Sequence, residues 1–364
     1  MSRPYLVIPK LIDQPTWGGD YIIKLKKWGD ITYYKNKKIG QSFELYGESL
    51  LATDIYSTKD SGFSPASKGI PINSVLTNGK TVPLLIKINQ ALGNSFQLHI
   101  KPGKKLNNWL PKPETWYFLE NGSITLGLNA QKDIKEYERV CTEIDSYMKN
   151  LSSEILTGKT SVNVARSKAK KFIASKNPWK YVNCFNVNKG SIIDLSEGAI
   201  HHSWEDNKNH SPLGNVVFEV QIDASDDDAT IRSFDQGKIK DDGTIRSLNI
   251  EDYFLAIDKD LIKNSLNYHL KLPSKDEFIK TKFYCVDLIT LSQNNKFLQN
   301  NQKTLENKGF CHYYVESGEV DVISDGNRDI NVTAGHSFFI PDSLNAYTII
   351  GKVKDTKILK TYLP

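Results

Sequence analysis

The segment Ser95–His99 constrains the fold of this chain more than any other short stretch. Its apolar residues, Phe96 and Leu98, alternate with three polar residues. Because side chains point alternately to the two faces of a β-strand, this segment as a strand would be apolar on one face. The other face would carry a hydroxyl, an amide and an imidazole. The alternation therefore predicts a strand of a small β-barrel with a polar site on its inner face.

Four polar side chains, from this strand and two later segments, form a candidate metal site. Gln97 and His99 would aim a carbonyl oxygen and an imidazole nitrogen at the same point. Glu114, ahead of an aromatic strand, adds a carboxylate, and His201 adds a second imidazole. Two nitrogen and two oxygen ligands suit Zn²⁺ with one coordination position left open. We predict one Zn²⁺ per chain here. Taken alone, Gln97 and His99 could instead be a pair of polar side chains inside a barrel whose hydrogen bonds are satisfied without a metal.

The length and composition are those of a globular protein with about two domains. Of its 364 residues, 39% are hydrophobic and 10% are aromatic, which is ordinary for a soluble protein. The net charge of +5 is scattered along the chain, whereas a nucleic-acid-binding protein usually concentrates its basic residues in a stripe. We therefore expect a small-molecule partner and no nucleic acid.

The expected location is the cytoplasm, without a membrane partner. No apolar run approaches the roughly 20 residues that a membrane span needs, and the N-terminal segment lacks the apolar core of a signal peptide. The four cysteines lie far apart, without a CxxC pair. This spacing is typical of a reducing compartment rather than of a disulfide framework. The expected assembly is a monomer or a homodimer.

The spacing of apolar residues changes once along the chain. Short apolar runs between turn residues predict strands in the first part, with 82–88 as a buried strand. Apolar residues then recur every three to four positions over 134–151, which predicts an amphipathic helix. A second helix is predicted over 162–173.

Strand patterns return after this helical block, between 181 and 220 and again from 281 onward. Residues 223–228 are expected to form an acidic loop. The chain is therefore predicted to be mostly β, with two β-barrels and a helical insertion at about 131–178 in the first.

One spacing of residues occurs twice. The two copies have the same intervals and consist of Gly190, Ser196, Gly198 and His201, and of Gly335, Pro341, Ser343 and Ala346. Both resemble the second sequence motif of cupins, Gly-x5-Pro-x-Gly-x2-His. Only the first copy keeps the histidine. We therefore expect two cupin-like barrels (jelly rolls): a catalytic, metal-binding domain at 1–250, which includes the helical insertion, and a metal-free domain at 251–364.

Longer stretches match a known enzyme family in order, from about residue 9 to the end of the chain. These stretches are Trp17–Gly19, Ile39–Glu44, Pro83–Ile88, Ser95–His99, Lys112–Glu114, Gly198–His201, Glu219–Asp235 and Gly335–Pro341. They resemble the class I mannose-6-phosphate isomerases. The resemblance implies a zinc enzyme that interconverts mannose 6-phosphate and fructose 6-phosphate by proton transfer through an enediolate. It assigns the zinc ligands to the four residues named above.

The resemblance also implies roles for two residues after the second ligand histidine. Glu219 would be the catalytic base, although it could instead be a carboxylate at a strand end that pairs with a nearby lysine or arginine. Arg232 would stabilise the enediolate or contact the phosphate, for which its planar guanidinium is suited. Alternatively, Arg232 is a surface residue that bridges to the acidic segment 226–228.

Two residues beside the metal ligands are expected to contact substrate. Lys112 would supply a phosphate contact or a proton, although lysines ahead of strands are usually solvated. Ser95 shares the ligand face and could bind phosphate through its hydroxyl, or it could be a buried hydroxyl bonded to the backbone.

The chain departs from the family pattern at the rim of the expected pocket. Ile100–Gly103 replaces the usual Pro-Asp-Asp, and Ile231 stands where a tyrosine usually precedes the arginine. Two other functions therefore stay open. One is a cupin that binds a sugar phosphate without turning it over, and the other is a different metal-dependent cupin enzyme, such as an oxygenase.

Overall fold

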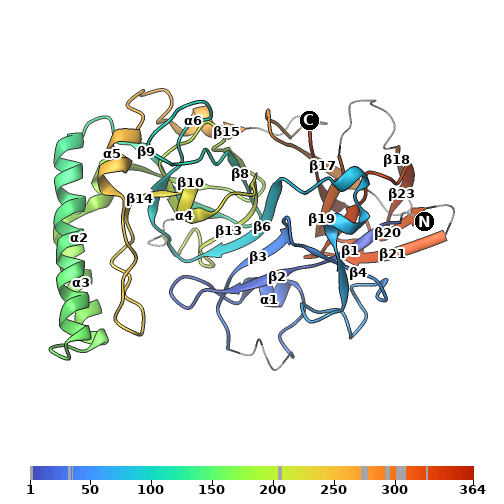
Figure 1. The fold of residues 1–364 in the computed structure, drawn as a ribbon, viewed down its shortest axis with the longest axis horizontal. Helices are drawn as coiled ribbons and strands as arrows, with labels where there is room; N and C mark the ends of the chain where they lie inside the picture. Colours follow the sequence, from blue (N-terminus) through green and yellow to red (C-terminus); the bar gives the residue numbers. More distant parts are fainter. Residues whose placement is uncertain are drawn as a thin grey trace.

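The computed structural model describes residues 3–31, 34, 36–203, 207–271, 278–291, 296–300, 309–324 and 327–364. These residues form four β-sheets in two pairs that lie side by side along the longest axis of the molecule (Figure 1). The mostly-β fold predicted from the sequence is confirmed. A pair of helices projects from the outer side of the first pair of sheets.

The first pair of sheets contains the predicted ligand strand, β7. The seven-stranded sheet has the order β15 (Leu270–Lys271), β11 (Ile192–Asp194), β8 (Glu114–Phe118), β13 (Asn215–Ile222), β6 (Leu84–Ala91), β3 (Ile39–Leu45) and β2 (Lys10–Asp13). The five-stranded sheet has the order β10 (Val182–Val187), β9 (Gly122–Leu128), β12 (His201–Ser203), β7 (Phe96–Leu98) and β14 (Ile231–Phe234). Phe96 and Leu98 are buried against the helical pair, as the alternation in this strand predicts.

The second pair of sheets is built mainly from the C-terminal part of the chain. The eight-stranded sheet has the order β16 (Ile279–Lys280), β17 (Cys285–Leu291), β24 (Thr356–Tyr362), β19 (Cys311–Ser317), β22 (Ser337–Ile340), β1 (Tyr5–Ile8), β4 (Leu50–Ala52) and β5 (Gly69–Pro71). The four-stranded sheet has the order β18 (Lys296–Asn300), β23 (Ala346–Gly351), β20 (Glu319–Ser324) and β21 (Asn327–Thr333).

Strands from the start of the chain belong to the second pair of sheets. β1 pairs antiparallel with β22, with Tyr5 opposite Phe339, and β4 and β5 extend the same sheet. Conversely, β15 pairs with β11 of the first pair, beyond residue 250. The domain boundary near residue 250 stays a prediction, and the two pairs of sheets exchange strands across it.

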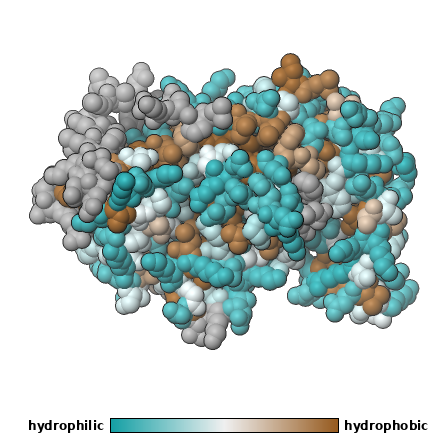
Figure 2. All heavy atoms as spheres, turned by 180° about the vertical axis from the view of Figure 1, so that it is seen from behind, coloured by the Kyte–Doolittle hydropathy of each residue, from teal (hydrophilic) through white to brown (hydrophobic). Residues whose placement is uncertain are grey.

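The two predicted helices are present. α2 spans Ile134–Leu156 and is capped at its N-terminus by Asp133, whose side chain accepts a hydrogen bond from the backbone N–H of Lys135. α3 spans Val162–Lys176. Their apolar faces pack together and onto the first pair of sheets, and their outward side chains are mainly hydrophilic (Figure 2). In the described part of the chain, no helix has both the length and the apolar character that crossing a membrane requires.

The remaining helices are short. They are α1 (Tyr21–Leu25), α4 (Asp226–Ala229), α5 (Ile250–Ala256), α6 (Leu266–His269) and the 3₁₀ helices η2 (Ile72–Val75), η3 (Thr77–Gly79) and η4 (Pro178–Tyr181). The prediction of an acidic loop at 223–228 is therefore confirmed for 223–225 and wrong for 226–228, which belong to α4. The hydroxyl of Ser225 accepts the backbone N–H of Asp227, and the aspartates of the first turn lie at the positive end of the helix.

The two copies of the repeated spacing occupy equivalent places in the two pairs of sheets. Gly190 and Gly335 have φ angles of +83° and +85°, a left-handed conformation that favours glycine, and each precedes a strand. His201 and Ala346 are the first residues of β12 and β23. The side chain at this position is therefore an imidazole in the first pair of sheets and a methyl group in the second.

Candidate metal centre

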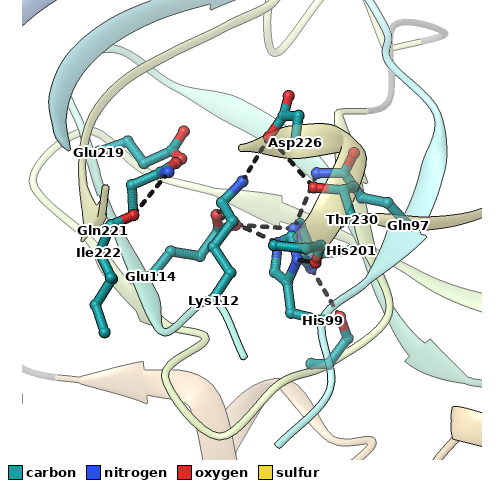
Figure 3. Close-up of polar contacts among 12 residues, drawn as sticks. Gln97, His99, Lys112, Glu114, His201, Glu219, Gln221, Ile222, Asp226 and Thr230 are labelled. Atoms are coloured by element: carbon teal, nitrogen blue, oxygen red, sulfur yellow. Dashed lines mark hydrogen bonds and ion pairs between the residues drawn. The ribbon is translucent and has the colours of Figure 1, made fainter. Parts of the chain in front are cut away.

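The four predicted ligands converge between the two sheets of the first pair (Figure 3). Glu114 is the first residue of β8 in the seven-stranded sheet. His201 is the first residue of β12 in the five-stranded sheet, where it lies opposite Gln97 of β7. His99 follows β7 directly. The carboxylate thus approaches from one sheet, and the imidazoles and the amide approach from the other.

The ligand atoms are close enough to share one cation. Nε2 of His201 lies 2.8 Å from Oε1 of Glu114, and Nε2 of His99 lies 3.3 Å from Oε2. One ligand atom from each of these three residues lies within 4.8 Å of the other two. All three side chains are buried.

Backbone contacts fix the proton on each histidine. Nδ1 of His99 donates to the carbonyl oxygen of Ala229 at 2.7 Å, and Nδ1 of His201 donates to that of Ala199 at 2.7 Å. In a neutral imidazole each Nε2 is then an acceptor, and it faces a carboxylate oxygen. Nε2 of His99 and both oxygens of Glu114 make no hydrogen bond. Because facing acceptors repel each other unless a cation lies between them, this donor set fits a metal ion.

The protonation states also suit a metal. Burial lowers the pKa of His99 to about 4, so its imidazole is neutral at pH 7. Burial alone would raise the pKa of Glu114, but Lys112 and the two histidines outweigh it and hold that pKa well below its usual range. A charged carboxylate beside a neutral imidazole is the form in which Glu114 and His99 would bind Zn²⁺.

The amide of Gln97 has a partner at each end. Its Nε2 donates to Nε2 of His201 at 3.1 Å, and Oγ of Ser95 donates to its Oε1 at 3.1 Å. Ser95 is therefore bonded to a predicted ligand rather than to the backbone. Both residues line the small pocket over the site.

Lys112 is a buried cation between two carboxylates. Its Nζ lies 3.2 Å from Oε2 of Glu114 and 3.0 Å from Oδ1 of Asp226 (Figure 3). Burial alone would lower the pKa of Lys112, but Asp226, Glu114 and Glu219 outweigh it and raise that pKa above its ordinary value. With 3% of its surface exposed, Lys112 is not the solvated lysine of the alternative expectation, and it stays protonated.

Glu219 lies on β13, on the wall of the same pocket. Its Oε1 is 3.1 Å from Nζ of Lys87, and its Oε2 accepts a hydrogen bond from Nδ2 of Asn89. The ion pair with a nearby lysine is therefore present, as the alternative expectation has it. Burial raises the pKa of Glu219 to about 7 in spite of Lys87.

Arg232 lies opposite Gln97 in the pairing of β14 with β7. Its Nη1 donates to the carbonyl oxygen of Thr230 at 3.2 Å, and its Nη2 is 3.6 Å from Oδ2 of Asp226. The expected contact with the acidic segment exists, but Arg232 is only 8% exposed and lines the pocket. Its buried Nε has no hydrogen-bond partner.

Two pocket residues were missed by sequence reasoning. Lys87 interrupts the apolar run of β6, and a lysine inside a buried strand was the available signal. Asp226, which contacts Lys112 and Arg232, belongs to the segment that was expected to be a loop. Its acidic neighbours gave no reason to single it out.

His202 points away from the site, as expected of the neighbour of His201 on a strand. Its ring packs against Phe96 at a centroid distance of 4.5 Å, and its Nδ1 contacts Oγ1 of Thr125 at 2.5 Å.

The fold matches that of solved mannose 6-phosphate isomerases. No protein-family model matches the sequence, and no curated protein matches it. The mannose 6-phosphate isomerase from Bacillus subtilis superposes with a TM-score of 0.65 at 14% identity, over 100% of both chains. The apo form from Salmonella typhimurium gives a TM-score of 0.64 at 12% identity, over 100% of both chains. A zinc-bound mannose 6-phosphate isomerase gives 0.65 at 12% identity, over 99% of both chains. The chain therefore has the cupin fold of the mannose 6-phosphate isomerases, and the resemblance inferred from its sequence is confirmed at the level of the fold.

Proposed function

We propose that this chain is a metal-dependent aldose–ketose isomerase that interconverts mannose 6-phosphate and fructose 6-phosphate. The observation that carries the proposal is the buried convergence of Glu114 with the Nε2 atoms of His99 and His201. The likeness in fold to mannose 6-phosphate isomerases, one of them zinc-bound, supports the same function.

One Zn²⁺ per chain would be held by His99, Glu114, His201 and Gln97. A half-turn of the Gln97 amide would exchange its oxygen and nitrogen and turn the oxygen toward His201, which a cation would favour. When bound, the ion would polarise the sugar oxygens, so that negative charge on them costs less.

The reaction needs a base that reaches two neighbouring carbons. In the direction from aldose to ketose, a base removes the proton from C2 of the open-chain sugar while the C1 carbonyl oxygen gains charge. The proton then returns to C1, and a hydroxyl proton moves from O2 to O1. Glu219 is our candidate base because it is buried on the pocket wall with a pKa of about 7, near the optimum for proton transfer at neutral pH.

Two cations on the pocket wall would stabilise the enediolate. Lys112 is protonated, so we assign it to charge stabilisation or proton donation rather than to base catalysis. Arg232 has a free buried Nε toward which an oxyanion could be drawn. The hydroxyl of Ser95 would contact the phosphate, in addition to its bond to Gln97.

The test is a coupled assay of fructose 6-phosphate formation from mannose 6-phosphate. Chelation should abolish activity and zinc should restore it. His201→Ala should lose the metal, whereas His202→Gln, the matched change on the opposite, buried face of the strand, should keep both metal and activity. Tight binding of sugar phosphate without turnover would instead identify a binding protein, and oxygen consumption with ferrous iron would identify an oxygenase.

A further inference from the structure

A second, larger cavity opens next to the pocket of the candidate metal centre. Its volume is about 870 Å³, within the range of ligand-binding cavities, whereas that of the inner pocket is about 100 Å³. The two share Gln14 and Arg246 in their walls, so the outer cavity is the direct neighbour of the inner pocket.

The wall of the outer cavity carries an excess of positive charge. Its six cationic residues are Lys37, Lys38, Arg166, Lys238, Lys240 and Arg246. Its three acidic residues are Asp13, Asp235 and Asp241. A concave surface lined mainly by one sign of charge concentrates ligands of the opposite sign.

Each acidic residue of this wall already has a cationic partner. Asp241 lies 2.8 Å from Nη2 of Arg166, Asp235 lies 3.4 Å from Nη1 of Arg246, and Asp13 lies 3.5 Å from Nζ of Lys37. Each of these three carboxylates is therefore already paired with a cation of the same wall. The side chains of Lys38 and Lys240 contact no carboxylate among the described residues, and both are exposed to the cavity.

The loop that carries Lys240 is held in place by the helical insertion. It follows β14 and runs beside α3 (Figure 1). Nε and Nη2 of Arg166 both donate to the carbonyl oxygen of Ile239, at 3.1 Å and 2.6 Å. The backbone N–H of Lys240 donates to the carbonyl oxygen of Thr244 at 2.9 Å. Little ordering of this loop would be needed when a ligand binds.

We propose that the outer cavity is an oxyanion site that binds a ligand with two or more phosphate groups, through Lys38 and Lys240. Phosphate groups offer several acceptor oxygens to such cations. The phosphates could belong to a separate ligand at the entrance or to an extended substrate whose sugar occupies the inner pocket. The second source rests on the proposed isomerase function, whereas the oxyanion site itself does not.

Calorimetric titration of the zinc-loaded full chain with inorganic tripolyphosphate tests the site without any need for turnover. We expect saturable binding that weakens as salt is added. The double variant Lys38→Gln/Lys240→Gln should bind about fivefold more weakly, the effect expected for two solvent-exposed charge pairs. The control Lys104→Gln/Lys105→Gln removes the same charge from an exposed loop outside the cavity and should bind as the parent chain does.

A repeat titration at saturating mannose 6-phosphate distinguishes the two sources. Loss of tripolyphosphate binding would indicate an extended substrate site, and retention would indicate a separate ligand. Absence of saturable tripolyphosphate binding, or equal weakening in the two double variants, would overturn the proposal. Neither result bears on isomerase activity, which the coupled assay measures separately.

Discussion

Two buried lysine–glutamate clusters in this molecule differ in how completely their atoms are satisfied. Lys26 and Glu44 lie where the two pairs of sheets meet, with an Nζ–Oε1 distance of 2.8 Å and no exposure of either side chain. Ser42 and Ser337 donate to the two oxygens of Glu44, and Lys26 donates to the carbonyl oxygen of Gly335. Every charged atom of this cluster therefore has a partner.

The cluster of Lys112 and Glu114 is different. Glu114 is as deeply buried as Glu44 and its Oε2 lies 3.2 Å from Nζ of Lys112, but neither of its oxygens makes a hydrogen bond, and the imidazoles of His99 and His201 face it. Buried polar groups are nearly always satisfied, so an unsatisfied cluster indicates either strain or an absent ligand. The comparison teaches that burial of charge does not identify a functional site, whereas unsatisfied acceptors that point at one another do.

Replacement of the central carboxylate should have the largest effect on activity. Glu114→Gln removes the only charged ligand, so the chain should lose zinc, and isomerase activity should fall by about a thousandfold or more. Metal analysis and the coupled assay check this. Lys112 keeps Asp226 as a partner, so the loss of unfolding free energy should be smaller than for Glu44→Gln. Full zinc content in Glu114→Gln would contradict the ligand set.

The matching change in the satisfied cluster should affect stability instead. Glu44→Gln leaves the ammonium of Lys26 buried without a carboxylate, which should lower the unfolding free energy by about 3–5 kcal/mol. Urea denaturation measures this quantity. Zinc content of the folded fraction should not change. A loss below about 1 kcal/mol would mean that the cluster stabilises the fold no more than a surface ion pair does.

A smaller effect is expected at the residue that holds Gln97. Ser95→Ala removes the hydroxyl that contacts the Gln97 amide and that would accept from Nε2 once the amide has turned its oxygen to the metal. Loss of such a supporting contact should weaken zinc binding by about tenfold. Competition with a zinc-binding dye measures the affinity. A rise in KM for mannose 6-phosphate without any change in zinc affinity would show that the hydroxyl serves the phosphate alone.

The smallest effect is a change of rate with pH. Burial raises the pKa of Glu219 to about 7, so half of the base is protonated at that pH. The value of kcat/KM should there be half of its value in alkaline solution, and it should fall further in more acidic solution. The value of kcat/KM falls as the pH is lowered because a base acts only when it is deprotonated. The residual activity of Glu219→Gln should lack this limb. An acidic limb that persists unchanged in Glu219→Gln would exclude Glu219 as the base.

Much of the candidate site could be predicted from the sequence because its ligands follow local rules. Gln97 and His99 share a face through strand alternation, and His201 is marked by its distance from Gly198. The helices α2 and α3 could be predicted because their apolar residues recur at the helical period. None of these inferences needs knowledge of which strands pair.

The features that could not be predicted depend on contacts between distant segments. Lys87 faces Glu219 because β6 and β13 pair in that register, which neither strand specifies alone. The cluster of Lys26 and Glu44 requires Gly335 and Ser337 from the other end of the chain, so no local pattern marks it. Asp226 contacts Lys112 across 114 positions of sequence, from the short helix that Ser225 caps, so neither segment alone indicates the contact.

The pairing of β1 with β22 has a consequence for synthesis of the protein. β1 is synthesised before β22, the strand that it joins, because nearly all of the described chain lies between the two strands. Until β22 is made, β1 and β4 present an unpaired edge, a form of β-structure that tends to associate with other chains. We therefore expect the nascent chain to depend on chaperones, and removal of the residues that form β22 to leave the N-terminal half prone to aggregation as well.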